Sequence, residues 1–445
     1  MISVQSSRRM RLAMIAAAVF PVSFADAADW PQWMGPDRDN RWSEEDIVAK
    51  FPEGGPKTLW STPVGIGYAG PSVAHGRVFV ADLQSEANVK DANFNRAETS
   101  GTERLLCLDA ASGKILWQHG YPVTYSISYP SGPRCTPLVD EGLVYFLGAE
   151  GKLTCLQAEA GEVVWERDLK RDYGTKAPLW GYAAHPIIDG ERLITLAGGD
   201  GSHVVALNKK TGEEIWRSGT APEQGYSPPK IIEAGGTRQL IVTSPASVYS
   251  VDPATGKQLW SQRYDATSGS IIMTPIFDGQ HVFVGGYSNR NLMLKLGADR
   301  PAAETLFKDR SNRGLSPVNV QPFLEDSVMY GIDGDGTLLA TELPSGERLW
   351  ETPQPLGDRP VQSGTAFIVK QGDRFFLFTE QGELVIAKMD RQGYTEIDRA
   401  KILEPTNSAF GRPVVWSAPA YANGCMFARN DEKCVCVDLR AASYQ

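Results

Sequence analysis

Aromatic, amide and cationic side chains gather just before a set of prolines that recur along this 445-residue chain. The prolines are Pro71, Pro137, Pro186, Pro229, Pro275, Pro322 and Pro419, and Ala366 takes the equivalent place in an eighth copy. A guanidinium can bind an anion, an aromatic ring can stack on a planar ligand, and an amide can orient either one. If the fold brings these segments together, they form a ligand site. The candidates are Arg134, Trp180, Tyr182, His185, Tyr226, Asn319, Gln321 and Trp416.

Carboxylates that could act as a general base are missing from the same positions. No Asp or Glu immediately precedes any of the seven prolines or Ala366. The nearest acids are Glu150, Asp200, Asp333, Asp335 and Glu380, all in expected hairpin turns. The stretch "GIDGDGT" has only part of a calcium-binding loop, and the five histidines lack the paired spacing of a zinc site. The sequence therefore predicts no catalytic residue and no metal ligand.

A second repeat, Gly-x-x-x-Trp, shows which elements must position these residues. Its copies end at Trp117, Trp165, Trp216, Trp260 and Trp350, with Phe307 and Ile397 in two degenerate copies and Trp60 as the first mark. Between the marks, segments such as "GRVFVAD" and "HVFVGG" are rich in β-branched and aromatic residues, as strands are. Each unit has room for four short strands, which is the size of a propeller blade.

These units predict an all-β fold, an eight-bladed β-propeller of four-stranded antiparallel blades. The tryptophan of each unit can fill the wedge between adjacent blades. The last unit, "SAPAYANGCMFARNDEKCVCVDLR", has three strands and no Trp, whereas no strand precedes Trp60. We therefore expect the N-terminal strand around Trp60 to complete the final blade and close the ring. The propeller is assigned to residues 57–440, between a leader at 28–56 and a C-terminal tail at 441–445.

Residues 1–27 are predicted to form an export signal. Arg8, Arg9 and Arg11 precede the apolar run "LAMIAAAVFPVSFA", and "ADA" ends at Ala27 with small residues suited to cleavage. The general secretory route is favoured over the twin-arginine route. Because the run is too short to span a bilayer, we expect a soluble protein without a stable membrane anchor. We expect it to be periplasmic or secreted, and to be a monomer. The net charge of −9 argues against nucleic acid as a partner.

Six cysteines in an exported protein suggest disulfides. Cys107, Cys155 and Cys436 occupy the same repeat position, however, which favours small buried thiols. Cys425 and Cys436 lie opposite each other if the hairpin between them turns midway. A cross-strand disulfide at this pair is therefore an alternative.

One segment departs from the repeat. The stretch "LQSEANVKDANFNRAETSGT", residues 83–102, lengthens the turn between the second and third strands of the first blade. Long loops in compact folds are typically functional or disordered. The sequence leaves two interpretations open. The segment is either a mobile surface loop or a lid or partner contact over the mouth of the central channel.

The stretch "DPATGKQLW", residues 252–260, follows the pattern Asp-x-x-Thr-Gly-x-x-x-Trp. It resembles the tryptophan-docking motif of the PQQ-like, or quinoprotein alcohol dehydrogenase-like, β-propeller repeat family. The leader "DWPQWMGPDRDNRW" is similar to the opening of secreted bacterial members. The resemblance covers residues from about 57 to 440 and implies eight blades. It implies an activity only weakly, because members include quinone-dependent alcohol dehydrogenases and cofactor-free scaffolds such as the BamB-type outer-membrane assembly propeller.

Three parts expected of such a dehydrogenase are absent from the sequence. No carboxylate precedes the strand-entry prolines, Val435 interrupts the cysteine pair in "CVC", and no C-x-x-C-H haem motif occurs. We therefore expect a non-catalytic binding or scaffold protein for an envelope protein or polymer, with no cofactor. One alternative is a PQQ-dependent alcohol or sugar dehydrogenase, with PQQ and calcium near Arg134, Trp180 and Trp416. Another is a glycan-binding propeller that uses Trp180, Tyr182 and Trp416.

Overall fold

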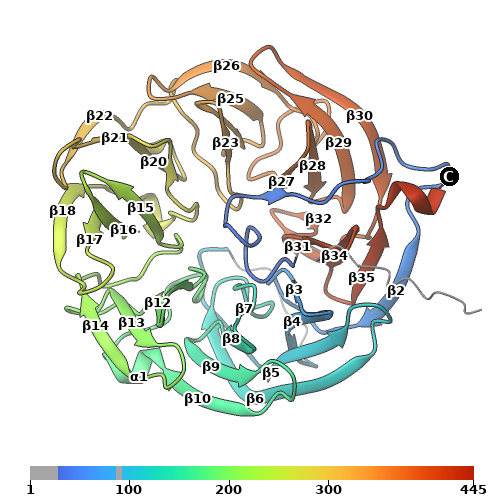
Figure 1. The fold of residues 1–445 in the computed structure, drawn as a ribbon, viewed down its shortest axis with the longest axis horizontal. Helices are drawn as coiled ribbons and strands as arrows, with labels where there is room; N and C mark the ends of the chain where they lie inside the picture. Colours follow the sequence, from blue (N-terminus) through green and yellow to red (C-terminus); the bar gives the residue numbers. More distant parts are fainter. Residues whose placement is uncertain (1–28, 87–92, 445) are drawn as a thin grey trace, which may run out of the picture.

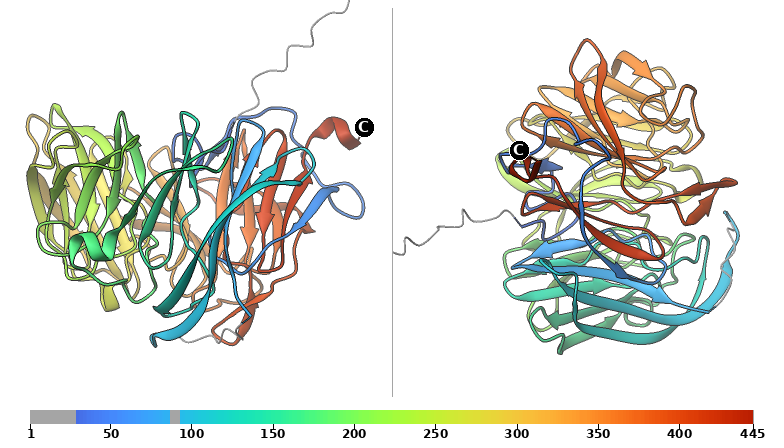
Figure 2. Two further views of the ribbon diagram at one scale, coloured as in Figure 1. Left: turned by 90° about the horizontal axis from the view of Figure 1, so that it is seen from below. Right: turned by 90° about the vertical axis from the view of Figure 1, so that its right-hand side faces the viewer.

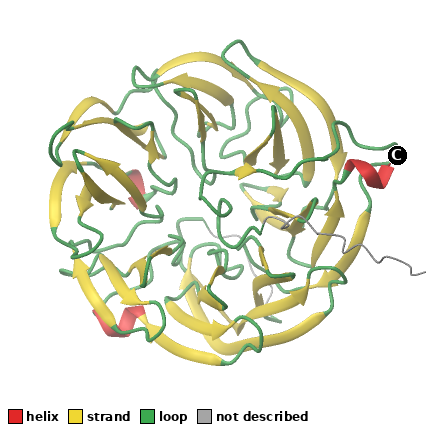
Figure 3. Ribbon diagram, in the orientation of Figure 1, coloured by secondary structure: helices red, strands yellow, loops and turns green. Residues whose placement is uncertain are grey.

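The computed structural model describes residues 29–86 and 93–444. In this part of the chain, eight β-sheets are arranged side by side around a central axis, and helices are limited to short turns (Figure 1, Figure 3). The predicted all-β, eight-bladed propeller is therefore confirmed. The predicted export signal, residues 1–27, lies outside the described residues. No helix within residues 29–86 and 93–444 has the length and apolar character needed to span a bilayer.

The first four blades follow one another along the chain, each with its first strand nearest the axis (Figure 1). Blade 1 consists of β3 (Ser72–Ala74), β4 (Arg77–Gln84), β5 (Ala97–Asp109) and β6 (Ile115–Ile127). Blade 2 consists of β7 (Leu138–Asp140), β8 (Leu143–Leu147), β9 (Lys152–Gln157) and β10 (Val163–Asp168), followed by α1 (Leu169–Tyr173). Blade 3 consists of β11 (Ile187–Asp189), β12 (Arg192–Leu196), β13 (Val204–Asn208) and β14 (Glu214–Ser218). Blade 4 consists of β15 (Lys230–Ala234), β16 (Thr237–Thr243), β17 (Ser247–Val251) and β18 (Gln258–Arg263), followed by η1 (Thr267–Gly269).

The last four blades include strands from both ends of the propeller. Blade 5 consists of β19 (Ile276–Phe277), β20 (His281–Gly286), β21 (Arg290–Leu296) and β22 (Ala303–Lys308). Blade 6 consists of β23 (Phe323–Glu325), β24 (Val328–Ile332), β25 (Leu338–Glu342) and β26 (Glu347–Thr352). Blade 7 consists of β27 (Ala366–Gln371), β28 (Arg374–Thr379), β29 (Glu383–Met389) and β30 (Tyr394–Lys401), with β1 (Arg41–Trp42) on its inner edge. A hairpin of β31 (Asn407–Ala409) and β32 (Arg412–Val414) precedes blade 8. Blade 8 consists of β33 (Ala420–Ala422), β34 (Cys425–Arg429), β35 (Lys433–Asp438) and β2 (Thr58–Pro63). The short turn η2 (Ala441–Tyr444) follows β35.

Tryptophans in the outermost strands join neighbouring blades, as the repeat predicted. The Trp117 indole of blade 1 donates a hydrogen bond to the Ala158 carbonyl of blade 2 at 3.2 Å. The Trp165 indole of blade 2 likewise donates to the Lys209 carbonyl of blade 3 at 3.0 Å. Each ring lies on a glycine of the receiving turn, and a Cβ added to Gly161 would lie 2.6 Å from the Trp117 ring. Gly161 also has a φ of +72°, so both the available space and the backbone favour glycine there.

The N-terminal strand closes the ring, as predicted. β2 pairs antiparallel with β35 in blade 8. The Trp60 indole donates to the Ala110 carbonyl of blade 1 at 2.9 Å, which repeats the docking contact between the two ends of the propeller. Arg429 of β34 lies fully buried at the same seam and donates to the carbonyls of Gly65 and Ala81. Strand pairing and buried hydrogen bonds therefore both close the ring.

The leader, drawn in blue in Figure 1, crosses the middle of the ring. It begins beside blade 1, where the backbones of Trp30 and Val73 pair. It passes blade 3, where the ring of Trp33 stacks on His185 with centroids 4.4 Å apart. It then reaches blade 7, where β1 pairs in parallel with β27. The leader therefore connects blades that are not neighbours in the ring.

All six cysteines are buried and free. Cys107, Cys155 and Cys436 each lie opposite the docking tryptophan of their blade, which confirms the buried thiols expected at this repeat position. The alternative of a disulfide between Cys425 and Cys436 is wrong. The hairpin turns one residue later than that pairing requires, so Cys425 lies opposite Asp438 and the two thiols are only diagonal neighbours.

The extra residues of blade 1 lengthen its strands as well as its turn. β5 and β6 stay paired to their ends, where Ala97 lies opposite Ile127. Figure 2 shows this long hairpin extending to one side of the ring. Tyr125 and Ile127 are fully buried, which explains why part of the segment predicted as a turn over residues 83–102 forms a strand. Residues 87–92 of that turn lie outside the described residues.

Candidate functional site

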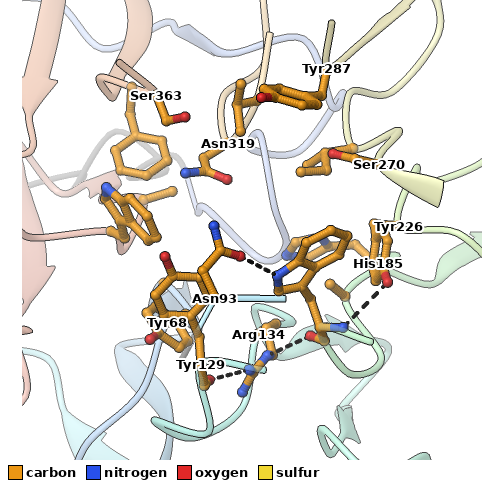
Figure 4. A pocket seen from close by; sticks show the side chains of 18 of the residues that line it. Tyr68, Asn93, Tyr129, Arg134, His185, Tyr226, Ser270, Tyr287, Asn319 and Ser363 are labelled. Carbon is orange, nitrogen blue, oxygen red and sulfur yellow. Dashed lines mark hydrogen bonds between the residues drawn. The ribbon is translucent and has the colours of Figure 1, made fainter. Parts of the chain in front are cut away.

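A cavity of about 240 Å³ lies where the segments that enter the first strand of each blade meet (Figure 4). All eight of these segments contribute residues to its wall, so the cavity lies on the axis of the ring. The wall also includes Trp33 of the leader, Asn93 and Phe94 of the blade 1 hairpin, and Phe410 of the β31–β32 hairpin. The propeller thus assembles one site from segments spread over most of the chain.

Six of the eight candidate residues line this cavity, namely Arg134, Trp180, His185, Tyr226, Asn319 and Trp416. The other two pack elsewhere. Tyr182 is 2% exposed, its ring covers Gly151 of blade 2, and its hydroxyl donates to the Ala197 carbonyl. Gln321 is buried and accepts a hydrogen bond from the Thr274 amide at 2.7 Å, which joins blades 5 and 6. Irregular segments have no fixed alternation of side chains, so position in the sequence alone does not separate the two groups.

Arg134 is the one cation in the described part of the cavity wall, and most of its donors are already used. The guanidinium donates hydrogen bonds to the main-chain carbonyls of Ser128, Tyr129, Gly132 and Trp180. It also lies over the ring of Tyr68, 5.0 Å from the centroid. Burial lowers the pKa of Arg134 from its usual value. Arg134 therefore braces the wall and has little capacity left for an anionic ligand.

Trp180 forms part of the apolar wall, and the blade 1 hairpin holds it in place. Its ring packs edge-on against Tyr226 and against Phe94, with centroids 5.4 Å apart in both pairs. Its indole Nε1 donates to the Asn93 side chain at 3.3 Å. The insertion into blade 1 thus helps to shape the cavity.

Glu380, expected in a hairpin turn, holds the second indole of the wall. Its carboxylate is 1% exposed and accepts hydrogen bonds from Arg412 at 2.7 and 3.2 Å and from the Trp416 indole at 3.3 Å. Trp416 in turn packs against Tyr129 and Phe410. Because Arg412 belongs to the β31–β32 hairpin, this one carboxylate positions both the hairpin and the indole.

Neutral polar groups line another part of the cavity. Figure 4 shows Ser270, Tyr287, Asn319 and Ser363 along one side. Within residues 29–86 and 93–444, the Nδ2 atom of Asn319 and the Oγ atom of Ser363 have no hydrogen-bond partner. Burial and the nearby Arg38 hold the pKa of His185 well below its usual value, so its imidazole is neutral. No carboxylate lines the described part of the wall.

One buried carboxyl near this site, Glu103 of β5, was not predicted. It is 1% exposed and accepts hydrogen bonds from the hydroxyls of Tyr121 and Tyr125 and from the Ala149 amide. Burial raises the pKa of the Glu103 carboxyl above its usual value, although these hydrogen bonds oppose the change. Glu103 directly follows residues 83–102, the segment predicted as a turn. The alternation of apolar and polar residues there does not indicate that this side chain is buried, so it could not be predicted from the sequence.

We expect the Glu103→Gln substitution to weaken the pH dependence of stability. The folded protein keeps the Glu103 proton at pH values where the unfolded chain releases it, so the stabilising contribution is complete below the usual pKa of 4.5 and is lost as pH rises through the folded pKa. Between the unfolded and the folded pKa, the wild type should therefore lose stability that the variant keeps. Thermal unfolding followed by circular dichroism measures this difference. Glu98→Gln, exposed on the same strand, is the control, and identical pH profiles for all three proteins would contradict the expectation.

A family model described as outer membrane protein assembly factor BamB matches residues 101–313 and 299–445. These matches cover most of the chain. The chain belongs to this PQQ-like propeller family. Among curated proteins, BamB of Yersinia pestis is 24% identical over 197 residues, which are 42% of this chain and 49% of that relative. The aligned part therefore spans about half the length of that relative.

Solved structures share the fold at low sequence identity. BamB from Moraxella catarrhalis has a TM-score of 0.58 at 15% identity, over 86% of this chain and 99% of that one. A quinohemoprotein alcohol dehydrogenase from Pseudomonas putida HK5 has a TM-score of 0.60 at 12% identity, over 93% and 80%. A europium-containing methanol dehydrogenase has a TM-score of 0.59 at 10% identity, over 92% and 89%. These likenesses concern the fold alone, so they do not choose between an assembly factor and a dehydrogenase.

The described wall of the cavity does not fit pyrroloquinoline quinone with calcium. The quinone is a tricarboxylate, so its site needs free cationic donors and oxygen ligands for the metal. Arg134, the one cation among the described lining residues, donates mainly to main-chain carbonyls. Within the described residues, no group of three or more His, Cys, Asp or Glu side chains is placed to hold a metal ion. The described part of the wall therefore lacks free cationic donors and metal ligands for this cofactor.

Proposed function

We propose that this propeller is a non-catalytic protein of the cell envelope that holds a protein partner through its loop-rich face. The observation that carries this proposal is a pair of hairpins with exposed aromatic side chains at the cavity. Phe94 in the blade 1 insertion is 52% exposed, and Phe410 in the turn of β31–β32 is 39% exposed. Aromatic side chains on a well-anchored surface are typical of the residues that dominate protein interfaces.

The chemistry around the hairpins supports binding rather than catalysis. Two carboxylates beside the cavity, Glu103 and Glu380, are both about 1% exposed and are hydrogen-bonded to protein groups, so neither is free to act as a general base for a ligand in the cavity. Relatives named as outer membrane protein assembly factors support a partner within the envelope. The export signal predicted at residues 1–27 supports a periplasmic or secreted location, in which the protein acts as a monomer.

Site-specific photocrosslinking tests this function. We place a photoreactive phenylalanine analogue at residue 94, 410 or 306, one at a time, in the full chain produced in its source organism. Leu306 is the control because it is 43% exposed on an outermost strand, away from the cavity. We expect positions 94 and 410 to give an adduct of the same partner, and position 306 to give none.

A second variant and a reconstitution make this experiment decisive. Trp180→Ala removes the ring that supports Phe94, so it should reduce the adduct at position 94 roughly tenfold. The purified partner should then bind the wild-type chain directly. Unrelated adducts at the three positions, or no adduct at 94 and 410, would contradict the proposed function.

The dehydrogenase alternative is tested on the purified chain. We expect no saturable binding of pyrroloquinoline quinone in the presence of calcium, because Arg134 has little free hydrogen-bonding capacity and no carboxylate lines the described wall. A dye-reduction assay over a panel of alcohols and sugars accompanies the titration. Saturable quinone binding with substrate-dependent dye reduction would establish the dehydrogenase instead.

A further inference from the structure

The interior of the cavity has two chemically different sides. Figure 4 shows Tyr68, Tyr129 and Arg134 on one side and Ser270, Tyr287, Asn319 and Ser363 on the other. Five aromatic rings come from the entries to blades 1 to 4 and 8, whereas the four polar residues come from blades 5, 6 and 7. The division is not complete, because Phe367 of blade 7 and Thr136 of blade 2 also line the cavity. A ligand that fills this space must therefore present an apolar face and a polar edge.

We propose that this cavity binds one neutral sugar ring of an oligosaccharide. One face of a pyranose exposes C–H groups, which can pack on aromatic rings such as Trp180 and Trp416. Its hydroxyls both donate and accept hydrogen bonds, and they lie around its edge. This site goes beyond the proposed function, because the partner protein contacts the exposed hairpins whereas the sugar occupies the space between them.

The polar side of the cavity argues against a purely apolar guest. Asn319 Nδ2 and Ser363 Oγ have no partner in the part of the chain that the structure describes, and Ser363 is 1% exposed. Ser270, which also lines the cavity, is 6% exposed. An apolar side chain would cover these groups without pairing them, which is unfavourable, whereas sugar hydroxyls can pair with them after small side-chain adjustments.

The electrostatics of the cavity argue against a charged guest. His185 is neutral, and Arg134 donates mainly to main-chain carbonyls. No carboxylate lines the described wall. A carboxylated or phosphorylated sugar would lose its hydration here without gaining an ion pair.

The size of the cavity suits a single ring. Its volume is about 240 Å³. A protein cavity of about 150 Å³ accommodates benzene, so this one has room for a six-membered ring with its hydroxyls. The remaining units of an oligosaccharide must extend past Phe94 and Phe410 at the surface.

Titration of the purified full chain with defined sugars tests this site. The probes are maltohexaose, cellohexaose and chitohexaose (the N-acetylated hexamer), with hexagalacturonate as the acidic comparator. Intrinsic tryptophan fluorescence and isothermal calorimetry report binding. We expect at least one neutral probe to bind at millimolar concentration or below, and the acidic probe to bind at least roughly tenfold more weakly.

Two variants locate the binding. Trp180→Ala removes an aromatic face, and Asn319→Ala removes an unpaired amide, so each should weaken binding roughly tenfold or more. Leu306→Ala and Asn312→Ala, both at exposed positions away from the cavity, are the matched controls and should bind like the wild type. Near-ultraviolet circular dichroism confirms that each variant is folded.

The sugar site is ruled out if no neutral hexasaccharide binds at millimolar concentration, or if hexagalacturonate binds more tightly. It is also ruled out if both folded cavity variants keep the wild-type affinity. Because the titration uses the purified chain alone, its failure leaves the crosslinking result at Phe94 and Phe410 unchanged. Conversely, the absence of a crosslinked partner does not affect the titration.

Discussion

Replacing Arg429 with methionine will lower the thermal unfolding temperature more than replacing an exposed arginine. Arg429 is fully buried at the seam between blades 8 and 1. It donates hydrogen bonds to the Ala81 carbonyl of β4 at 2.7 Å and to the Gly65 carbonyl, which lies between β2 and β3. Methionine fills a similar space without a donor, so these carbonyls are left unpaired. We expect a loss of roughly 2–5 kcal/mol in the free energy of unfolding, because each buried carbonyl that loses its donor costs about 1–3 kcal/mol.

Differential scanning calorimetry measures this effect against a matched control. Arg217→Met removes the same charge from a side chain that is 57% exposed, so its effect should stay within about 0.5 kcal/mol. Arg429→Lys keeps the charge but has a different donor geometry, so its unfolding temperature should lie between those of the wild type and Arg429→Met. Equal unfolding temperatures for Arg429→Met and Arg217→Met would show that the seam does not depend on this side chain.

The Trp42→Ala substitution will release the leader from the middle of the ring. Trp42 is 2% exposed and packs against Phe376 and Tyr421, with ring centroids 5.6 and 5.0 Å away. Its indole also donates to Glu44 at 2.7 Å. Loss of a buried indole costs roughly 3–5 kcal/mol. The substitution weakens the packing of the leader, which pairs with blade 7 through the short strand β1. We therefore expect the leader to open before the blades unfold.

Limited digestion with trypsin measures this opening, because Arg38 and Arg41 lie in the leader. If cleavage follows local opening, a local loss of about 3 kcal/mol makes cleavage there roughly a hundredfold faster. Trp42→Phe retains much of the packing and should be cleaved more slowly than Trp42→Ala. Leu59→Ala, at a position 37% exposed, should behave like the wild type. Unchanged cleavage in Trp42→Ala would show that the leader is held by other contacts.

The architecture could be predicted from the sequence because it depends on features that repeat. Each docking tryptophan needs a glycine in the next blade, so both residues recur at regular spacing and mark the blades even where Phe307 replaces the indole. Ring closure could be inferred because the sequence shows no blade strands before Trp60 and the last unit has no tryptophan, although the structure adds the two-residue strand β1, which pairs with blade 7. The path of the leader could not, because it occurs once and its contacts with blades 1, 3 and 7 follow no repeat.

The site could be predicted less completely for a related reason. The propeller geometry brings the strand-entry segments together, but their irregular backbone does not reveal which side chains face the axis. Tyr182 therefore packs on Gly151 while its neighbour Trp180 lines the cavity. The burial of Glu103 depends on two tyrosines that reach it only because β5 and β6 continue beyond the usual blade length. Such single contacts leave no pattern in a sequence.

The route of the leader also affects the order in which the chain can reach its native state. Residues that are synthesised early cannot pair until their partners have been synthesised, since β1 pairs with β27 and Ile47 pairs with Arg440. In the same way, β2 cannot pair until β35 has been synthesised. Blades 1 to 6 can form from neighbouring hairpins while the polypeptide is still emerging. We therefore expect docking of the amino-terminal segment to be a late and slow event, during which Trp30, Trp42 and Trp60 stay open to chaperones.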